Sequence, residues 1–211
     1  MSPSAEVARR LLEIRAVQLR PNDPFTWASG LLSPIYCDNR IALSYPAVRT
    51  LIKHALRERA QAFAPFEAIV GVATAGIAPG VLLADLLELP FAYVRSSAKE
   101  HGLRNRIEGF LLPQQRVLVV EDLISTGGSS LSAVEALREA GCVVVGVLAI
   151  FQYGLEKATA AFEAQNVPFA TLTDYPTLLR EALNTGYIDE QGHLMLEHWR
   201  QNPEGWGALY A

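Results

Sequence analysis

The segment from Val117 to Ser130, which reads VLVVEDLISTGGSS, constrains the fold of this chain more than any other stretch. Its branched apolar residues predict a buried strand, and two carboxylates, Glu121 and Asp122, stand at the carboxyl end of that strand. A short loop of serine, threonine and glycine comes next, and apolar residues then recur at helical spacing from Leu131. Because a strand, such a loop and a helix in this order present backbone N–H groups to a phosphate, the segment predicts a phosphate-binding site.

The two carboxylates separate this segment from commoner phosphate-binding loops. No lysine follows Gly127 or Gly128, which excludes a Walker-type loop, and the Gly-x-Gly-x-x-Gly pattern of dinucleotide-binding proteins is absent. Adjacent acids before a phosphate cradle suit a ligand that carries hydroxyls beside its phosphate, such as a ribose 5-phosphate. The alternative is an ordinary turn between a strand and a helix, with a Glu-Asp pair on its rim.

The rest of the chain predicts a single α/β domain over residues 1–211. Ser4 is expected to cap a first helix, and Pro46 is expected to open a second. The expected strands comprise residues 68–72, 91–94, 117–120, 143–151 and 169–172, and further helices are expected near residues 81–87, 131–140, 156–165 and 177–184. Strands that alternate with helices predict a largely parallel central sheet flanked by helices, with ligands at the carboxyl ends of the strands.

Composition excludes several classes of partner. The net charge of −4 and the pI near 5.6 argue against a nucleic-acid surface. The longest uncharged apolar run, residues 142–151, is too short to span a bilayer, and the first residues do not resemble a signal peptide. The spacing of the two cysteines, Cys37 and Cys142, suits no metal site. We therefore expect a cytoplasmic protein with reduced thiols.

The segment 117–130 resembles the signature of the type I phosphoribosyltransferases, which bind phosphoribosyl pyrophosphate (PRPP). The resemblance implies that Glu121 and Asp122 bind the ribose hydroxyls and that residues 125–129, hereafter the signature loop, cradle the 5-phosphate. The residues that it implies for PRPP binding in this segment are Glu121, Asp122, Leu123, Ile124, Ser125, Thr126, Gly127, Gly128 and Ser129.

A second loop follows the predicted strand 68–72. It consists of Ala73, Thr74, Ala75 and Gly76, and its amides could reach a further phosphate group. Alone this signal is weak, and a simple turn is the alternative. The phosphoribosyltransferases use a loop at this position for the pyrophosphate of PRPP, so we name it the pyrophosphate loop.

Residues 95–109 are polar and too long for a simple turn, which favours a mobile lid. Transfer of a ribosyl group expels pyrophosphate through an oxocarbenium-like state. A cationic lid that closes over the leaving group would stabilise this state and exclude water. The alternative is a solvated charged loop.

The lid sequence YVRSSAKEHG, which continues to NRIEG, resembles the catalytic loop of the orotate phosphoribosyltransferases. The resemblance implies that Lys99 is catalytic and that Arg95 and His101 bind PRPP. It also implies a homodimer, because the loop reaches the site of the neighbouring subunit. The motifs PFTWASG and SPIYCDNR resemble the part of these enzymes that covers the base, which we name the hood (residues about 1–45, with part of the C-terminus).

Some positions depart from the family pattern. One branch has lysines or an arginine where this chain has Ala28, Ser96 and Tyr153, so the carboxylate of orotate has no obvious cationic partner. Arg40, within the hood motif, is our hypothesis for that role. Ser125 is the expected contact to the base.

The resemblance as a whole implies transfer of the phosphoribosyl group from PRPP to orotate, giving orotidine 5-phosphate and pyrophosphate, in the synthesis of pyrimidines. It implies Mg²⁺ held mainly by PRPP, without a dedicated set of metal ligands. Two alternatives are an enzyme that acts on another base and a PRPP-sensing regulator that retains the fold without the chemistry. The hood and lid motifs disfavour the first, and the acidic charge and Lys99 disfavour the second.

Overall fold

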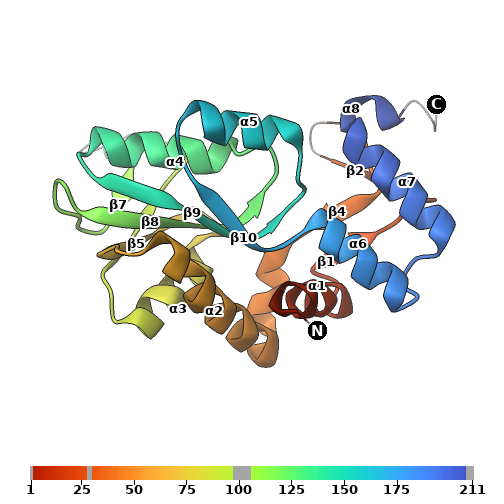
Figure 1. The fold of residues 1–211 in the computed structure, drawn as a ribbon, viewed down its shortest axis with the longest axis horizontal. Coiled ribbons are helices and arrows are strands. Elements are labelled where there is room, and N and C mark those ends of the chain that lie inside the picture. Colours follow the sequence, from red (N-terminus) through yellow and green to blue (C-terminus); the bar gives the residue numbers. More distant parts are fainter. Residues whose placement is uncertain (1, 28–29, 97–105, 208–211) are drawn as a thin grey trace.

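A computed structural model describes residues 2–27, 30–96 and 106–207 of the chain (Figure 1). Its centre is a six-stranded sheet with the order β10-β9-β8-β5-β6-β7. Strands β10, β9, β8, β5 and β6 are parallel to one another, and of the six strands only β7 is antiparallel to its neighbour. The predicted, largely parallel sheet is therefore confirmed. The strands are β5 (Ala68–Val72), β6 (Phe91–Val94), β7 (Ile107–Glu108), β8 (Arg116–Ile124), β9 (Val143–Gln152) and β10 (Phe169–Asp174).

Helices cover both faces of this sheet, as Figure 1 shows. The helices α4 and α5 lie on one face, whereas α2 and α3 lie on the other with α1 beside them. Alternate side chains of each strand enter two separate apolar cores, because successive residues of a strand point to opposite faces. These helices are α1 (Pro3–Glu13), α2 (Pro46–Ala60), α3 (Ile77–Leu87), α4 (Gly128–Glu139) and α5 (Glu156–Ala164).

Two helix starts differ from the predictions. The cap of α1 is Ser2, whose Oγ accepts from the amide of Ala5 at 3.2 Å, and not Ser4, whose hydroxyl instead lies 3.2 Å from that of Thr173. Helix α3 begins at Ile77, ahead of the predicted start, because a proline in the first turn of a helix is tolerated and Pro79 lies there. Helix α2 begins at Pro46 as predicted.

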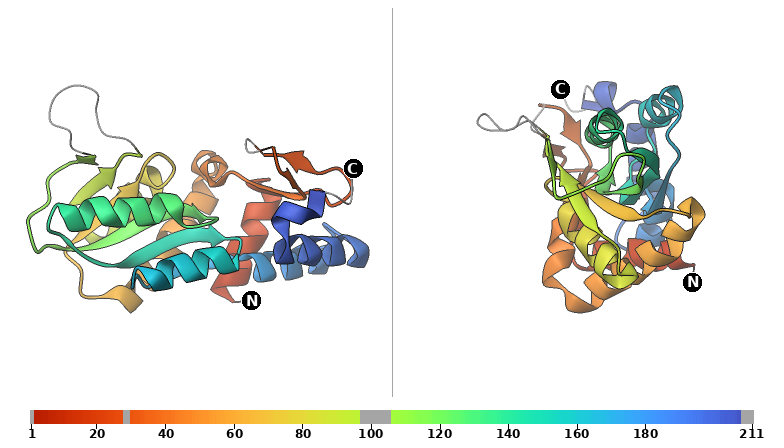
Figure 2. Two further views of the ribbon diagram at one scale, coloured as in Figure 1. Left: turned by 90° about the horizontal axis from the view of Figure 1, so that it is seen from above. Right: turned by 90° about the vertical axis from the view of Figure 1, so that its left-hand side faces the viewer.

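The two ends of the chain meet in the hood. Two small antiparallel pairs, β1 with β4 and β2 with β3, lie beside the C-terminal helices (Figure 2). The rings of Trp27 and Trp199 join them with centroids 5.9 Å apart, and Tyr153 and Tyr175 pack against Trp199. The remaining elements are β1 (Val17–Leu19), β2 (Phe25–Thr26), β3 (Leu32–Ser33), β4 (Ile35–Cys37), α6 (Tyr175–Asn184), α7 (Glu190–Gln201), α8 (Pro203–Trp206) and the 3-10 helices η1 (Asn39–Ser44) and η2 (Gln61–Phe63).

None of the helices in the described ranges has the length and apolar character that a membrane crossing requires. Both cysteines are free thiols, Cys142 buried and Cys37 half-buried.

Replacement of Trp199 by alanine should destabilise the protein by about 3–5 kcal/mol, because this ring is 1% exposed and its loss leaves a cavity between α7 and the hood. Urea unfolding followed by circular dichroism would measure the change in the free energy of unfolding. Leu194→Ala, on the same helix but 69% exposed, is the matched control and should change it little. Equal effects of the two substitutions would contradict this account of how α7 is attached.

Candidate active site

The loops at the carboxyl ends of β5, β6 and β8 come together at one edge of the sheet. The parallel register pairs Gly71 of β5 with Val120 of β8, so the loops that follow lie side by side. A cavity of about 230 Å³ opens between them. Its lining combines the start of the pyrophosphate loop, the start of α4 and the two ends of the lid, and comprises Val72, Ala73, Val94, Arg95, Ser96, Arg106, Ser129, Ser132 and Ala133.

The signature loop exposes the N-terminus of α4. Gly127 has φ +84°, and a Cβ there would lie 2.8 Å from the ring of Phe162, so both conformation and space require glycine. Helix α4 begins at Gly128, and no side chain of the described residues caps it. Its first backbone N–H groups and the positive end of its dipole are therefore available to an anion, as expected for a phosphate cradle.

The pyrophosphate loop has two available amides. The amide of Ala73 donates to the carbonyl of Val94 and that of Gly76 to the carbonyl of Val72, at 2.9 and 2.8 Å. The amides of Thr74 and Ala75 have no partner among the described residues. The peptide bond between Ala73 and Thr74 is cis.

The two acids of the signature lie on opposite faces of β8. Glu121 is buried on the side of α4, where its carboxylate accepts hydrogen bonds from the hydroxyls of Ser129 and Ser130 at 3.0 and 3.3 Å. Asp122 is half-buried and lines a small cavity of about 20 Å³ on the side of α3. Of the two side chains, Asp122 is therefore the one with the freer carboxylate.

Burial governs the titration of this pair. Desolvation, followed by the nearby charge of Asp122, raises the pKa of Glu121 to about 8. Desolvation also raises the pKa of Asp122, although the hydrogen bonds that it accepts oppose the shift. Perturbed carboxylates beside an anion site are typical of functional positions.

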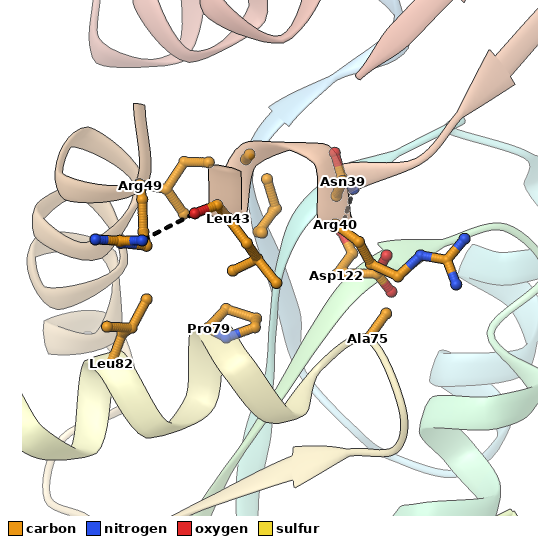
Figure 3. A pocket seen from close by; sticks show the side chains of 11 residues that line it. Asn39, Arg40, Leu43, Arg49, Ala75, Pro79, Leu82 and Asp122 are labelled. Carbon is orange, nitrogen blue, oxygen red and sulfur yellow. Dashed lines mark hydrogen bonds between the residues drawn. The ribbon is translucent and has the colours of Figure 1, made fainter. Parts of the chain in front are cut away.

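Asn39 connects the hood to the signature strand (Figure 3). Its Nδ2 donates to the backbone carbonyl of Asp122 at 2.8 Å, and the residue is only 3% exposed. Its Oδ1 is buried without a partner in the described part of the chain. No role was predicted for Asn39, although it stands within the hood motif SPIYCDNR.

Arg40 projects from the same turn but is already paired. Its Nε and Nη2 donate to the two carboxylate oxygens of Asp38 at 2.6 and 2.9 Å, and its side chain is 60% exposed. Arg40 lines the small cavity with Ala75 and Asp122, whereas Ser125 lines a different cavity beside the hood. The two residues expected to contact the base therefore line separate cavities.

Hydrogen bonds between Arg95 and Arg106 hold the two ends of the lid together. The amide of Arg95 donates to the carbonyl of Arg106 at 2.8 Å, and the Arg95 guanidinium lies 3.6 Å from the carboxylate of Glu108. The guanidinium of Arg106 in turn donates to the backbone carbonyls of Arg95 and Ser132. Arg106 was missed as a site residue, although it belongs to the NRIEG motif. Lys99 and His101 lie outside the described residues.

A dedicated metal site is not evident in the part of the chain that the structure describes, since no three His, Cys, Asp or Glu side chains gather there.

The stability of the protein without ligands should fall as the pH rises from about 4.5 to about 8. Over this range the native state retains the proton of Glu121, whereas the unfolded chain has lost it, so a higher pH favours unfolding by at most about 1.4 kcal/mol per pH unit. The change Glu121→Gln should flatten this dependence. Glu139→Gln, at an exposed position of α4, should leave it intact. Melting temperatures across the range would test this, and an unchanged slope in Glu121→Gln would reject the assignment.

Comparison with known proteins agrees with this geometry. A sequence profile described as "Phosphoribosyl transferase domain" matches residues 40–171. The orotate phosphoribosyltransferase of Bacillus caldolyticus is 55% identical over 203 residues, which cover 96% of this chain and 98% of the relative.

Two solved structures have the same fold. The orotate phosphoribosyltransferase of Aeropyrum pernix superimposes with a TM-score of 0.75 and 31% identity, covering 87% of this chain and 99% of that one. The enzyme of Mycobacterium tuberculosis in complex with PRPP has a TM-score of 0.64 and 27% identity, covering 84% and 99%. The matched profile, the high identity over nearly the whole length and the shared fold lead to one conclusion: the chain belongs to the phosphoribosyltransferase family and, within it, to the orotate phosphoribosyltransferases.

Proposed function

We propose that this protein transfers the 5-phosphoribosyl group of PRPP to orotate, giving orotidine 5-phosphate and pyrophosphate, in the synthesis of pyrimidines. The observation that carries the proposal is the meeting of two loops with available amides, residues 73–76 and 125–129, at one edge of the sheet, where Ala73, Ser129 and Arg95 line a cavity of about 230 Å³. Two such loops beside the guanidinium of Arg95 suit a ligand with phosphates at both ends. The enzyme from Mycobacterium tuberculosis, similar to this chain, was solved with PRPP.

The two phosphate groups of PRPP would divide between the loops. The free amides at the start of α4, with the hydroxyl of Thr126, would bind the 5-phosphate. The amides of Thr74 and Ala75 would bind the pyrophosphate. The ribose then spans the edge of β8, where the half-buried carboxylate of Asp122 accepts from its hydroxyls and Ser125 contacts the base.

The reaction exchanges one bond at C1 of the ribose for another. The C1–O bond to pyrophosphate breaks with its electron pair on the leaving oxygen, and a ring nitrogen of the base bonds to C1 and loses its proton to solvent. Negative charge grows on the pyrophosphate, so cations positioned there stabilise the transition state more than the ground state. We assign this role to Lys99, with Arg95 and His101 binding PRPP, in a lid of residues 95–109.

Magnesium fits this site as a cation shared with the substrate. Mg²⁺ retains several waters and is bound through one or two carboxylates together with phosphates, and Asp122 offers a half-buried carboxylate at the correct edge. The ion would neutralise charge on the pyrophosphate. The protein's own part is to hold Asp122 in place, which the hydrogen bond from Asn39 does.

The proposal also covers the oligomeric state and the cellular compartment of the protein. We infer a single domain over residues 1–211 that acts as a homodimer, in which the lid of one subunit serves the site of the other. Two free thiols suit a reducing compartment, the cytoplasm. Arg40 stays a prediction as the cation for the base carboxylate.

Wild-type protein should consume orotate when PRPP and Mg²⁺ are present, and Lys99→Ala should lower kcat by about 100-fold or more, because a positioned transition-state charge is lost. The loss of orotate absorbance measures both rates. Lys53→Ala, which removes a lysine from α2, a helix that contributes no residue to the cavity between the loops, should leave the rate unchanged.

No turnover of orotate by wild type would contradict the proposed reaction. A panel of other bases would then test for a related transferase, and PRPP binding without turnover of any base would favour a regulator. An equal rate for Lys99→Ala and wild type would instead contradict the role of the lid lysine.

A lid that serves the neighbouring subunit predicts complementation. Lys99→Ala and Asp122→Asn should each be nearly inactive alone, but subunits mixed in equal amounts should regain about a quarter of wild-type activity. Half of the dimers are then mixed, and one of their two sites has both an intact lid and an intact carboxylate. A lid that acts on its own subunit would give no recovery after the same exchange of subunits.

A further inference from the structure

A third cavity, of about 350 Å³, lies beside the signature loop and shares no lining residue with the two described above. Ser125 and Thr126 line it, as do the apolar side chains of Trp27, Leu31 and Leu155. The rest of the lining is mainly polar and includes the acids Glu156 and Glu204 as well as the cations Lys157 and Arg200. Its volume and the apolar part of its lining suit a small planar ring. The cavity therefore extends the site from the phosphate cradle toward the hood.

Arg200, in the last turn of α7, brings a guanidinium to this cavity. Its Nη2 donates to the carboxylate of Glu197 at 3.3 Å. Its Nε is buried and has no partner among the residues that the structure describes. A guanidinium has five N–H donors, and only one hydrogen bond, that of Nη2 to Glu197, uses them among the described residues. Because the side chain is 32% exposed, its remaining outer donors can bind an acceptor that a ligand supplies.

The guanidinium lies close to the start of the signature loop. The amide of Tyr153 donates to the carbonyl of Ile124, the residue before Ser125, at 3.2 Å. The next residue, Gly154, has φ +67° and no side chain, and a Cβ built there would lie 3.9 Å from Nη1 of Arg200. Arg200 therefore lies beside Gly154. Its positive charge comes from helix α7, whereas one branch of the family has an arginine at the position of Tyr153.

The other candidates for a positive charge are less well placed. Nε and Nη2 of Arg40 already donate to the carboxylate of Asp38, and Arg40 lines a different cavity. Tyr153 carries no positive charge in either protonation state, and burial raises the pKa of its phenol well above the ordinary value, so the side chain is neutral. Lys157 lines the same cavity as Arg200 but is exposed, and an ammonium lacks the planar fork that matches a carboxylate.

We propose that Arg200 binds the carboxylate of orotate in this cavity and thereby selects orotate over pyrimidines that lack a carboxylate. The inference rests on the proposed function and deepens it by naming a specificity-determining residue. A charge-assisted, two-pronged hydrogen bond is the strongest polar contact that a protein offers to a carboxylate. Trp27 and Leu155 would contact the ring, while Ser125 contacts its polar edge.

The test measures how Arg200→Gln changes the two Michaelis constants. The KM for orotate should rise at least about 10-fold, as expected for the loss of a charged hydrogen-bond partner, while the KM for PRPP stays the same. Uracil, which has no carboxylate, should inhibit the variant and the wild type equally. Arg200→Lys should give an intermediate KM for orotate. Arg180→Ala, which removes an equally charged side chain from an exposed position of α6, should change neither constant.

Four outcomes would overturn the proposal. An unchanged KM for orotate in Arg200→Gln excludes the contact, and a parallel weakening of orotate, uracil and PRPP indicates a merely structural role. If the KM for orotate rises more in Arg40→Ala or Lys157→Ala than in Arg200→Gln, the orotate carboxylate binds Arg40 or Lys157 instead. Wild type that does not turn over orotate contradicts the proposed function itself, which distinguishes the two failures.

Discussion

The parallel pairing of β8 with β5 is the constraint on which the site depends. It places the ends of the two strands at one edge, so the loops that follow, residues 73–76 and 125–129, lie close together. Gly76 tightens this arrangement, because a Cβ at this position would lie 2.5 Å from the carbonyl oxygen of Val120. Only glycine fits at this position, so the close approach of the pyrophosphate loop to β8 depends on Gly76.

Much of the fold could be predicted because it follows from local patterns. The buried parallel strands are continuous apolar runs, and each helix that covers them shows its own periodicity. The short pairs β1–β4 and β2–β3 could not be predicted, since strands of two or three residues depend on the tertiary contacts around them. Helices α7 and α8 were missed for a related reason: their attachment depends on Trp199 and Trp206, which are buried only when the hood is in place.

The candidate site divides in the same way. Its loops were predicted, because two acids near the end of a strand and then hydroxyl and glycine residues form a recognisable order. Residues that reach the site from elsewhere were not. Asn39 acts on the carbonyl of Asp122 across 83 positions of sequence, Arg106 acts on the start of α4, and Arg200 comes from a C-terminal helix. The role of such a side chain depends on a tertiary contact, so the residues next to it in the sequence do not indicate that role.

The ring contact between Trp27 and Trp199 has a consequence for how such proteins diverge. The family profile covers residues 40–171, which contain both phosphate loops, whereas these two tryptophans lie outside it on either side. In the proposed site, the surface facing the base would combine the chain's two extremities with Ser125 of the signature loop, whereas both phosphate loops lie within the profile. Mutations in the extremities could then change the choice of base without altering the phosphate loops. Selectivity for the base and catalysis can then evolve at different rates.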